Sequence, residues 1–295
     1  SRYDIADGKA ELFRQPAVPV DTSRYMTEQV FYRSKDGTRV PMFITRRKDL
    51  KLDGNNPVRL HGYGGFAAAQ VPGYKAEIIA WLELGGAYAL ANLRGGNEYG
   101  KAWHEAGTKS KKQNVFDDFI AAAEYLIEHK YTSPKRLAIT GRSNGGLLVG
   151  AVMVQRPELF GAALPHVGVL DMLRYHTASA NAYQWSSDYG LSEVAEDFQA
   201  LYAYSPYQAA DRQEGICYPP TLVSTADHDD RVVPWHSYKF AAALQRTQSC
   251  GNPVLLTVET RAGHGAGKPT WKQIEEMVEN YAFLGYHLKM DLDAL

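Results

Sequence analysis

From residue 58 onward, short apolar runs alternate along the chain with longer segments whose apolar residues recur at helical spacing. The apolar runs lie at 58–61, 87–92, 136–140, 162–167, 221–225 and 254–259, and the helical segments at 74–84, 115–128, 146–155, 236–245 and 269–288. Strand–helix alternation of this kind predicts a parallel sheet with helices on both faces. The active site of such a sheet lies at the carboxyl ends of its strands, so the residues that follow each run indicate the function.

A predicted hairpin precedes this pattern. Residues 28–32 and 38–44 have strand character, and Asp36-Gly37 between them is the signal of a tight turn. Together with the six runs, the hairpin predicts an α/β fold with a mostly parallel, eight-stranded sheet. We expect residues 28–295 to form one domain. Residues 1–27, which contain Pro16 and Pro19, are expected to be a linker or the end of an upstream domain.

Residues 168–219 interrupt the alternation. They are rich in tyrosine, include Trp185 and contain no clear strand. We expect an insertion over the top of the sheet, a position that often supplies substrate contacts.

Composition excludes several classes of protein. Apolar residues make up 45% of the chain, and the net charge is −1, from 32 basic and 33 acidic residues. This balance argues against a nucleic acid or a membrane surface as partner, and no apolar run approaches the roughly 18 residues of a membrane span. A locally basic run, Lys109, Lys111 and Lys112, is expected to be a solvated face.

The two cysteines, Cys217 and Cys250, have no metal-ligand spacing and are too few for a disulfide framework. We therefore expect free thiols, a reducing compartment such as the cytoplasm, and neither a metal nor a cofactor. No signal peptide opens the chain. Because residue 1 is Ser rather than Met, a leader could precede it, and a periplasmic or secreted location stays open.

The candidate nucleophile is Ser143. Residues 141–145 fit G-x-S-x-G, with a predicted strand directly before them and a predicted helix directly after. This arrangement is the nucleophile elbow of α/β-hydrolases, in which glycines make room for a sharp turn that exposes the serine. The start of the helix offers backbone N–H groups to an oxyanion, so Asn144 is a candidate donor.

The candidate acid and base follow the last two strands, in the Ser–Asp–His order of α/β-hydrolases. His264, between two glycines, is the candidate base, and Asp227, Asp229 and Asp230 compete for the role of the acid. His228 and His236 compete weakly with His264, because they lie too close to the aspartates to come from a separate strand end.

A glycine-rich loop, residues 61–66, follows the first parallel strand. It is similar to the oxyanion loop of hydrolases. The second oxyanion donor is therefore expected to be a backbone N–H of this loop or the Tyr63 hydroxyl.

Taken together, these segments resemble the prolyl oligopeptidase family of serine peptidases. The resemblance extends from about Glu28 to the last helix and rests on residues 63–66, 92–100, 112–119, 143–146, 227–234 and 262–269. It implies an α/β-hydrolase domain that cleaves after proline in short peptides, with Asp229 as the acid and Tyr63 as the second oxyanion donor. It also implies that Trp185 stacks on the substrate proline, that Phe66, Tyr189 and Val232 line its pocket, and that Arg231 binds a substrate carbonyl.

The family usually carries a β-propeller on the N-terminal side of the hydrolase. The resemblance therefore implies that these residues are the catalytic portion of a longer polypeptide.

Two features depart from the family. Arg142 precedes the nucleophile where many relatives have Gly, and Arg59 and His61 occupy a core strand that is more apolar in relatives. Three alternatives to a prolyl endopeptidase stay open: a related oligopeptidase with basic, dipeptidyl or acyl-aminoacyl specificity, an esterase, and a non-catalytic binding module. The last is disfavoured because no triad member is missing.

Overall fold

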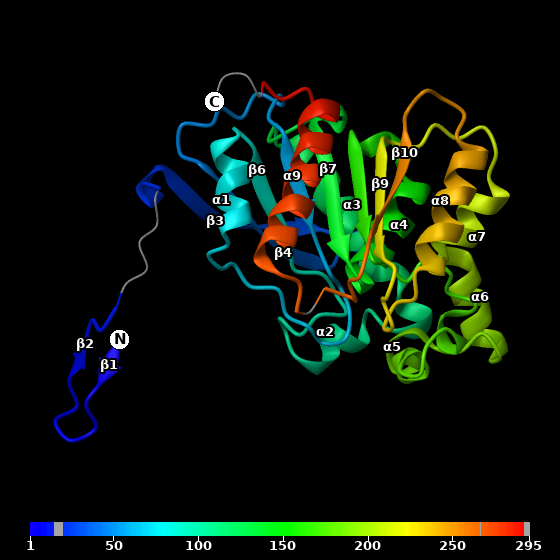
Figure 1. Cartoon of the computed structure of the whole chain (residues 1–295), viewed down its shortest axis with the longest axis horizontal. Helices are drawn as coiled ribbons and strands as arrows, with labels where there is room; N and C mark the ends of the chain where they lie inside the picture. The colour runs from blue at the N-terminus through cyan, green and yellow to red at the C-terminus, as the bar shows by residue number, and fades with distance from the viewer. Residues whose placement is uncertain (15–19, 266, 292–295) are drawn as a thin grey trace.

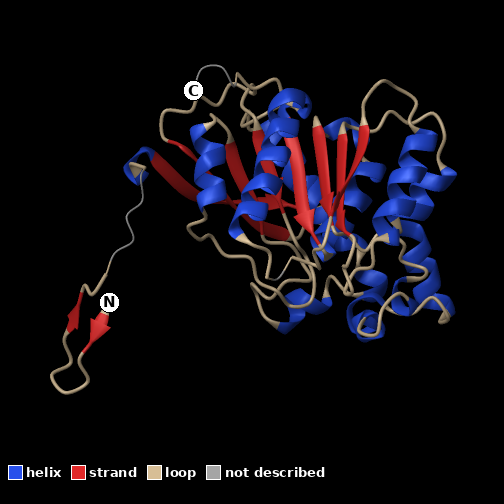
Figure 2. Ribbon diagram, in the orientation of Figure 1, coloured by secondary structure: helices blue, strands red, loops and turns tan. Residues whose placement is uncertain are grey.

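The main feature of the fold is an eight-stranded sheet with helices on both faces (Figure 2). The computed structural model describes residues 1–14, 20–265 and 267–291. In spatial order the strands are β10 (Val254–Glu259), β9 (Thr221–Ala226), β8 (Ala162–His166), β7 (Leu137–Arg142), β5 (Val58–His61), β6 (Ala87–Ala91), β4 (Arg39–Arg47) and β3 (Tyr25–Arg33). The strands from β10 to β6 pair in parallel, whereas β4 is antiparallel to both neighbours. The predicted α/β fold and its mostly parallel, eight-stranded sheet are confirmed.

Each face of the sheet buries its own hydrophobic cluster. One face packs against α3 (Gln113–Glu128), α4 (Asn144–Gln155) and α8 (Trp235–Thr247), and the other against α1 (Ala76–Glu83) and α9 (Thr270–His287) (Figure 1). Successive side chains of a strand point to opposite faces. In β6, accordingly, Ala89 belongs to the first cluster and Tyr88 to the second. Burial on both sides explains why these strands read as nearly continuous apolar runs.

Short helices lie at the end of the sheet toward which the parallel strands point. These are α2 (Lys101–Glu105) and α5 (Ser186–Tyr189) (Figure 1). The insertion 168–219 also contains α6 (Ala195–Tyr204) and α7 (Pro206–Arg212), and no strand of the described sheet comes from it. Short 3₁₀ turns lie at Thr22–Arg24, Lys109–Lys111, Pro134–Arg136, Pro157–Leu159, Tyr175–Thr177 and Ala182–Trp185. The chain therefore places extra structure at the strand ends where a site is expected.

The N-terminal residues form a small pair of strands of their own. β1 (Arg2–Tyr3) pairs with β2 (Ala10–Glu11) and is not part of the main sheet. Pro16 and Pro19, on which the predicted linker partly rests, lie outside the described residues. The assignment of residues 1–27 to a linker or upstream domain stays a prediction.

The expectation of free thiols is wrong. Cys217 and Cys250 form a disulfide with their Cα atoms 5.3 Å apart. Cys217 lies just before β9 and Cys250 just before β10, and these strands are parallel neighbours. The segments that enter the two strands therefore lie side by side, although 33 residues separate the cysteines.

Candidate active site

The turn from β7 into α4 places Ser143 at the carboxyl end of the sheet. Its backbone has φ 59° and ψ −117°, a region that non-glycine residues rarely occupy and that is typical of functional sites. The turn needs glycine at two flanking positions. A Cβ added at Gly141 would lie 2.3 Å from the Gly145 carbonyl oxygen, and one at Gly146 would lie 2.6 Å from the His166 carbonyl oxygen. The structure thus contains the strand–turn–helix geometry that the G-x-S-x-G pattern predicts.

Asp229 and His264 form a hydrogen-bonded pair at the ends of β9 and β10. Nδ1 of His264 lies 2.7 Å from Oδ2 of Asp229. The Asp229 side chain is completely buried, and its Oδ1 accepts hydrogen bonds from the backbone N–H groups of Arg231 and Val232 at 3.1 and 2.9 Å. A carboxylate held in this way keeps the proton on Nδ1 and leaves Nε2 of the imidazole free to act as a base.

The competing acids and histidines lie elsewhere. Asp227 pairs with the exposed His228, 2.7 Å from its Nδ1, and Asp230 is exposed. His236 is buried in α8, where its Nδ1 accepts a hydrogen bond from a backbone N–H. Only Asp229 of the three aspartates therefore contacts His264.

The candidate nucleophile and the candidate base are not hydrogen-bonded to each other. Among the described residues, no hydrogen bond joins the Ser143 hydroxyl to His264, although both lie at carboxyl ends of strands in the same sheet. Catalytic hydrogen bonds are often long without substrate and shorten when it binds.

The predicted oxyanion donors are Asn144, which directly follows Ser143, and Tyr63, in the loop after β5. Asn144 is the first residue of α4, where backbone N–H groups are free to bind an anion. Its side-chain Nδ2 donates to the Tyr63 carbonyl oxygen at 2.5 Å, which ties the glycine-rich loop to the elbow. Burial, supplemented by the Asp188 carboxylate, raises the pKa of Tyr63, so its hydroxyl keeps its proton and can donate.

A buried lysine, which the sequence analysis assigned to a solvated face, lies beneath this loop. Lys112 is 1% exposed, whereas Lys109 and Lys111 are exposed as expected. Its Nζ donates to the Gly64 carbonyl oxygen at 2.9 Å and to Asn144 Oδ1 at 3.3 Å. Burial lowers the pKa of Lys112 to about 8 despite the opposing charge of Asp188. The solvated-face prediction is wrong for Lys112, since a charge run does not reveal which of its members points inward.

A small pocket of about 200 Å³ opens at Ser143. The described residues that line it come from five separate segments: Tyr63, Phe66, Ser143, Val169, Trp185, Tyr189 and Arg231. The Phe66 and Tyr189 rings meet edge to face at 5.3 Å, and Trp185 lies parallel to Tyr175 at 6.3 Å. Val232 is only 2% exposed and does not belong to this described lining. The fold thus brings an aromatic wall and a guanidinium together beside the nucleophile.

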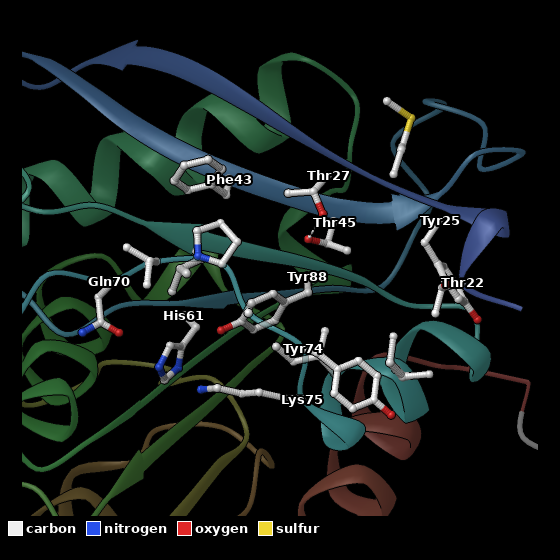
Figure 3. A pocket seen from close by; sticks show the side chains of 17 residues that line it. Thr22, Tyr25, Thr27, Phe43, Thr45, His61, Gln70, Tyr74, Lys75 and Tyr88 are labelled. Atoms are coloured by element: carbon white, nitrogen blue, oxygen red, sulfur yellow. Dashed lines mark hydrogen bonds between the residues drawn. The ribbon is translucent and has the colours of Figure 1, made fainter. Parts of the chain in front are cut away.

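A larger pocket, of about 370 Å³, lies away from the triad (Figure 3). It lies between α1 and the strands β3, β4 and β6, where Phe43, Tyr74 and Tyr88 supply rings and Lys75 and His61 supply polar groups. None of its described lining residues belongs to the triad. The pocket at Ser143 is therefore not distinguished by its volume.

The two unusual polar residues of β5 have partners within the fold. Nη1 of Arg59 donates to the Tyr281 hydroxyl at 2.9 Å, and its guanidinium lies 5.0 Å above the Tyr88 ring. His61 Nδ1 lies 3.1 Å from Thr140 Oγ1, and burial lowers the pKa of His61 to about 3, so the ring is neutral. Neither departure reaches the triad.

Comparison with known proteins decides the family. The model of the prolyl oligopeptidase family matches residues 72–291. The chain belongs to this family. It is 50% identical to the prolyl endopeptidase of Elizabethkingia meningoseptica over 97% of this chain and 40% of that protein, and 45% identical to the prolyl endopeptidase of Dictyostelium discoideum over 98% of this chain and 39% of that protein. The resemblance read from the sequence is therefore confirmed.

Solved structures of the prolyl oligopeptidase family have the same fold. A prolyl endopeptidase structure superposes with a TM-score of 0.94 at 52% identity, covering 98% of this chain and 42% of that one. Oligopeptidase B from Leishmania major gives 0.89 at 32% identity, covering 96% of this chain and 40% of that one. The chain thus spans about two fifths of the length of the relatives it matches.

Metal-ligand clusters and membrane-spanning helices are both absent from the described part of the chain. No cluster of three or more His, Cys, Asp or Glu side chains there could hold a metal ion. No helix there is long and apolar enough to cross a bilayer.

Proposed function

We propose that this chain is the catalytic part of a serine endopeptidase that cleaves short peptides on the carboxyl side of proline through an acyl-enzyme on Ser143. The observation that carries the proposal is the hydrogen-bonded pair of buried Asp229 and partly buried His264, at the same end of the sheet as a serine held on a strained elbow. The prolyl endopeptidases among its relatives support the choice of substrate.

The proposed mechanism divides the chemistry among these groups. Ser143 Oγ attacks the scissile carbonyl carbon while His264 Nε2 takes its proton and later transfers it to the leaving amine. Asp229 holds the imidazole tautomer and stabilises the imidazolium. The carbonyl oxygen becomes an oxyanion that accepts hydrogen bonds from the Asn144 N–H and the Tyr63 hydroxyl. Water then repeats the sequence on the ester and releases Ser143.

Proline specificity is proposed to come from the aromatic pocket. A proline residue has no backbone N–H to recognise, so a flat ring is the available contact. Trp185 would stack on the pyrrolidine, with Phe66 and Tyr189 around it. Arg231 is exposed beside Ser143 and would bind the carbonyl one residue upstream.

Two alternatives are a related oligopeptidase with another specificity and an esterase. A pocket for a basic side chain would need a carboxylate, and the described lining of the pocket at Ser143 contains none. An ester substrate would use the same triad, so only a comparison of the rates on esters and peptides distinguishes an esterase from a peptidase.

The test compares chromogenic peptides that end in Pro, Arg or Ala with a simple ester. We expect the Pro peptide to give the highest kcat/KM, an organophosphate to label Ser143, and Ser143→Ala to lower kcat by about 10⁶-fold. A higher kcat/KM for the Arg or Ala peptide would refute proline specificity. More than a few per cent of activity in Ser143→Ala would refute the nucleophile.

A second experiment tests Trp185. Trp185→Ala should weaken transition-state binding of Pro substrates by about 1–3 kcal/mol, because it removes the stacking face. Tyr183→Ala, at a 60% exposed ring in the same turn, is the matched control and should leave the Pro-over-Ala preference unchanged. An unchanged preference in Trp185→Ala would show that the ring does not set specificity.

The compartment and the missing domain also belong to this proposal. The disulfide between Cys217 and Cys250 supports an oxidising compartment, periplasmic or extracellular, over the cytoplasm. The relatives are about two and a half times as long as the matched part, which supports a longer polypeptide with a β-propeller over the strand ends. Short proline-containing peptides are the proposed substrates, and neither nucleic acid nor a membrane is a proposed partner.

A further inference from the structure

A cluster of five charged side chains connects the nucleophile elbow to the loop that carries His264. We call it the loop clamp, and its members are Arg142, Glu259, Lys268, Lys272 and Glu276. Arg142 is the last residue of β7 and Glu259 the last of β10, while Glu276 and Lys272 lie on α9. Lys268 follows His264 by four positions. The cluster thus joins three elements that meet behind the catalytic histidine.

Glu276 is the centre of the clamp. Its Oε1 accepts a hydrogen bond from Arg142 Nη1 at 2.5 Å, and its Oε2 accepts one from Lys268 Nζ at 2.8 Å. Although burial opposes it, the Arg142 charge and the hydrogen bond from Lys268 lower the pKa of Glu276 to about 2, so the carboxylate is ionised. Charge-assisted hydrogen bonds of this kind are stronger than neutral ones.

The clamp reaches the backbone next to His264. A Cβ added at Gly265 would lie 3.0 Å from Arg142 Nη2, so the guanidinium lies beside the residue that follows the catalytic histidine. The side chain of Lys268 is 8% exposed, so the far side of the loop is anchored in a largely buried position.

The two halves of the loop are held differently. Backbone hydrogen bonds tie its first half to the aspartate loop, from Asp227 N–H to the Glu259 carbonyl and from His228 N–H to the Ala262 carbonyl. Beyond His264, the described residues are held by side chains: Lys268 pairs with Glu259 of β10 and with Glu276 of α9, and Gly265 lies beside the Arg142 guanidinium. Through Arg142, the clamp therefore reaches back from this half of the loop to the nucleophile elbow.

We infer that Arg142, Glu276 and Lys268 position His264 against Ser143, so that the residue before the nucleophile also sets the reach of the base. The inference rests on the proposed peptidase function. It gives a purpose to Arg142, which stands where many relatives have glycine. These three are positioning residues, because none of them contacts the reacting atoms.

The inference predicts a particular kinetic defect. Acylation by an amide requires His264 to take the Ser143 proton and then protonate the leaving amine, whereas a nitrophenyl ester loses a stable phenolate that needs no proton. Displacement of the imidazole should therefore lower the rate of acylation by amides more than the rate of acylation by matched activated esters. A displacement of about 1 Å can cost on the order of 10²-fold in rate.

The experiment uses the 295-residue chain with one proline-containing acyl group on an anilide and on a nitrophenyl ester. Acylation rates are normalised by active-site titration with an organophosphonate, which removes losses due to misfolding. The variants are Glu276→Gln, Arg142→Gln, their double variant and Arg142→Lys. Glu279→Gln, an exposed carboxylate on the same helix, is the matched control.

We expect Glu276→Gln and Arg142→Gln each to lower the amide rate by about 10- to 100-fold, with KM nearly unchanged and a smaller loss for the ester. The double variant should lose no more than Glu276→Gln alone, because the two side chains act through one contact, and Arg142→Lys should recover most of the amide rate. If Glu276→Gln does not fold, Arg142→Gln decides, since Arg142 is 41% exposed and its loss leaves the core intact.

Amide-to-ester ratios for Glu276→Gln and Arg142→Gln equal to that of Glu279→Gln would overturn the inference and leave the proposed function standing. A wild-type chain that cleaves the ester but not the amide would overturn the proposed function and the inference together.

Discussion

At the scale of single residues, the direction of a side chain, and not only its type, decides whether it can act in the proposed triad. Asp227, Asp229 and Asp230 are the same amino acid within four positions, yet only Asp229 contacts His264. Backbone N–H groups of Arg231 and Val232 hold its other oxygen, so the carboxylate has little freedom to turn.

We predict that Asp229→Asn folds normally and loses about 10⁴-fold in kcat, because an amide at this position favours the wrong imidazole tautomer. Asp230→Asn, at an exposed neighbouring position, is the control and should keep nearly full activity. Steady-state kinetics with the Pro peptide make the comparison. The reverse ranking of the two variants would reassign the acid.

Lys112 allows a prediction about pH. Its folded pKa is about 8, against 10.5 for an ordinary lysine, because burial disfavours the charge. Between these values the unfolded chain binds the proton and the folded chain does not, so stability rises with pH. The cost of burying the charged lysine lowers the free energy of unfolding by about 3 kcal/mol. This cost is fully present below pH 8 and disappears as the pH passes 10.5.

We therefore expect the free energy of unfolding of the wild type, relative to Lys112→Met, to rise by about 2–3 kcal/mol from pH 7 to pH 10. Urea unfolding at both pH values measures this difference. Lys111→Met, at the exposed neighbour, should show no such change relative to the wild type. A pH-independent difference for Lys112→Met would mean that Lys112 titrates as a solvated lysine.

At the scale of elements, parallel strands bring segments together at both of their ends. The carboxyl ends of β7, β9 and β10 carry Ser143, Asp229 and His264. The opposite ends of β9 and β10 carry the disulfide between Cys217 and Cys250. The candidate catalytic residues and the disulfide therefore lie at opposite ends of the strands of one sheet.

Reduction of this disulfide should lower the free energy of unfolding by about 2–4 kcal/mol, because it releases a constraint on the unfolded chain. We expect kcat to change little, since the disulfide lies at the ends of the strands opposite those that carry the proposed triad. Urea unfolding with and without reductant measures the effect, and the Cys217→Ser/Cys250→Ser double variant should not respond to reductant. If reductant did not change the free energy of unfolding of the wild-type chain, the result would contradict the disulfide.

At the scale of the whole molecule, the site is open on the side where the proposed propeller would lie. The pocket at Ser143 is small. Loops and the insertion at the strand ends supply the described residues that line it. Residues 1–14 add four large apolar side chains that are more than 60% exposed, Tyr3, Ile5, Leu12 and Phe13. Exposed apolar surface of this extent favours association.

We expect the 295-residue chain to cleave a short proline peptide and an unfolded, proline-containing protein, because the proposed propeller that would restrict access to Ser143 is not part of it. A longer form with the proposed upstream domain should cleave the peptide and reject the protein. We also expect the shorter chain to associate at high concentration, which size-exclusion chromatography would detect. A monodisperse 295-residue chain that is fully active and rejects the protein substrate would contradict the proposed propeller.

The sequence by itself determined the eight strands of the main sheet, the five long helices that cover it and their order, but not β1, β2, α2 or the helices of the insertion. The structure gives β5 and β10 the predicted bounds, because apolar runs between turn residues are a local signal. Ser143 was identifiable since its glycines are required by close contacts within a single turn. The order of Ser, Asp and His along the chain then followed from successive strand ends.

Only the tertiary structure decided which side chains meet. Asp229 lies 35 residues from His264, the cysteines are 33 apart, and Arg142 and Glu276 are 134 apart. Local periodicity contains no information on contacts at such separations, which is why the thiols were expected to be free and Lys112 to be solvated. Burial of Lys112 depends on how the glycine-rich loop, α4 and α5 pack over it, and that packing exists only once the whole sheet has formed.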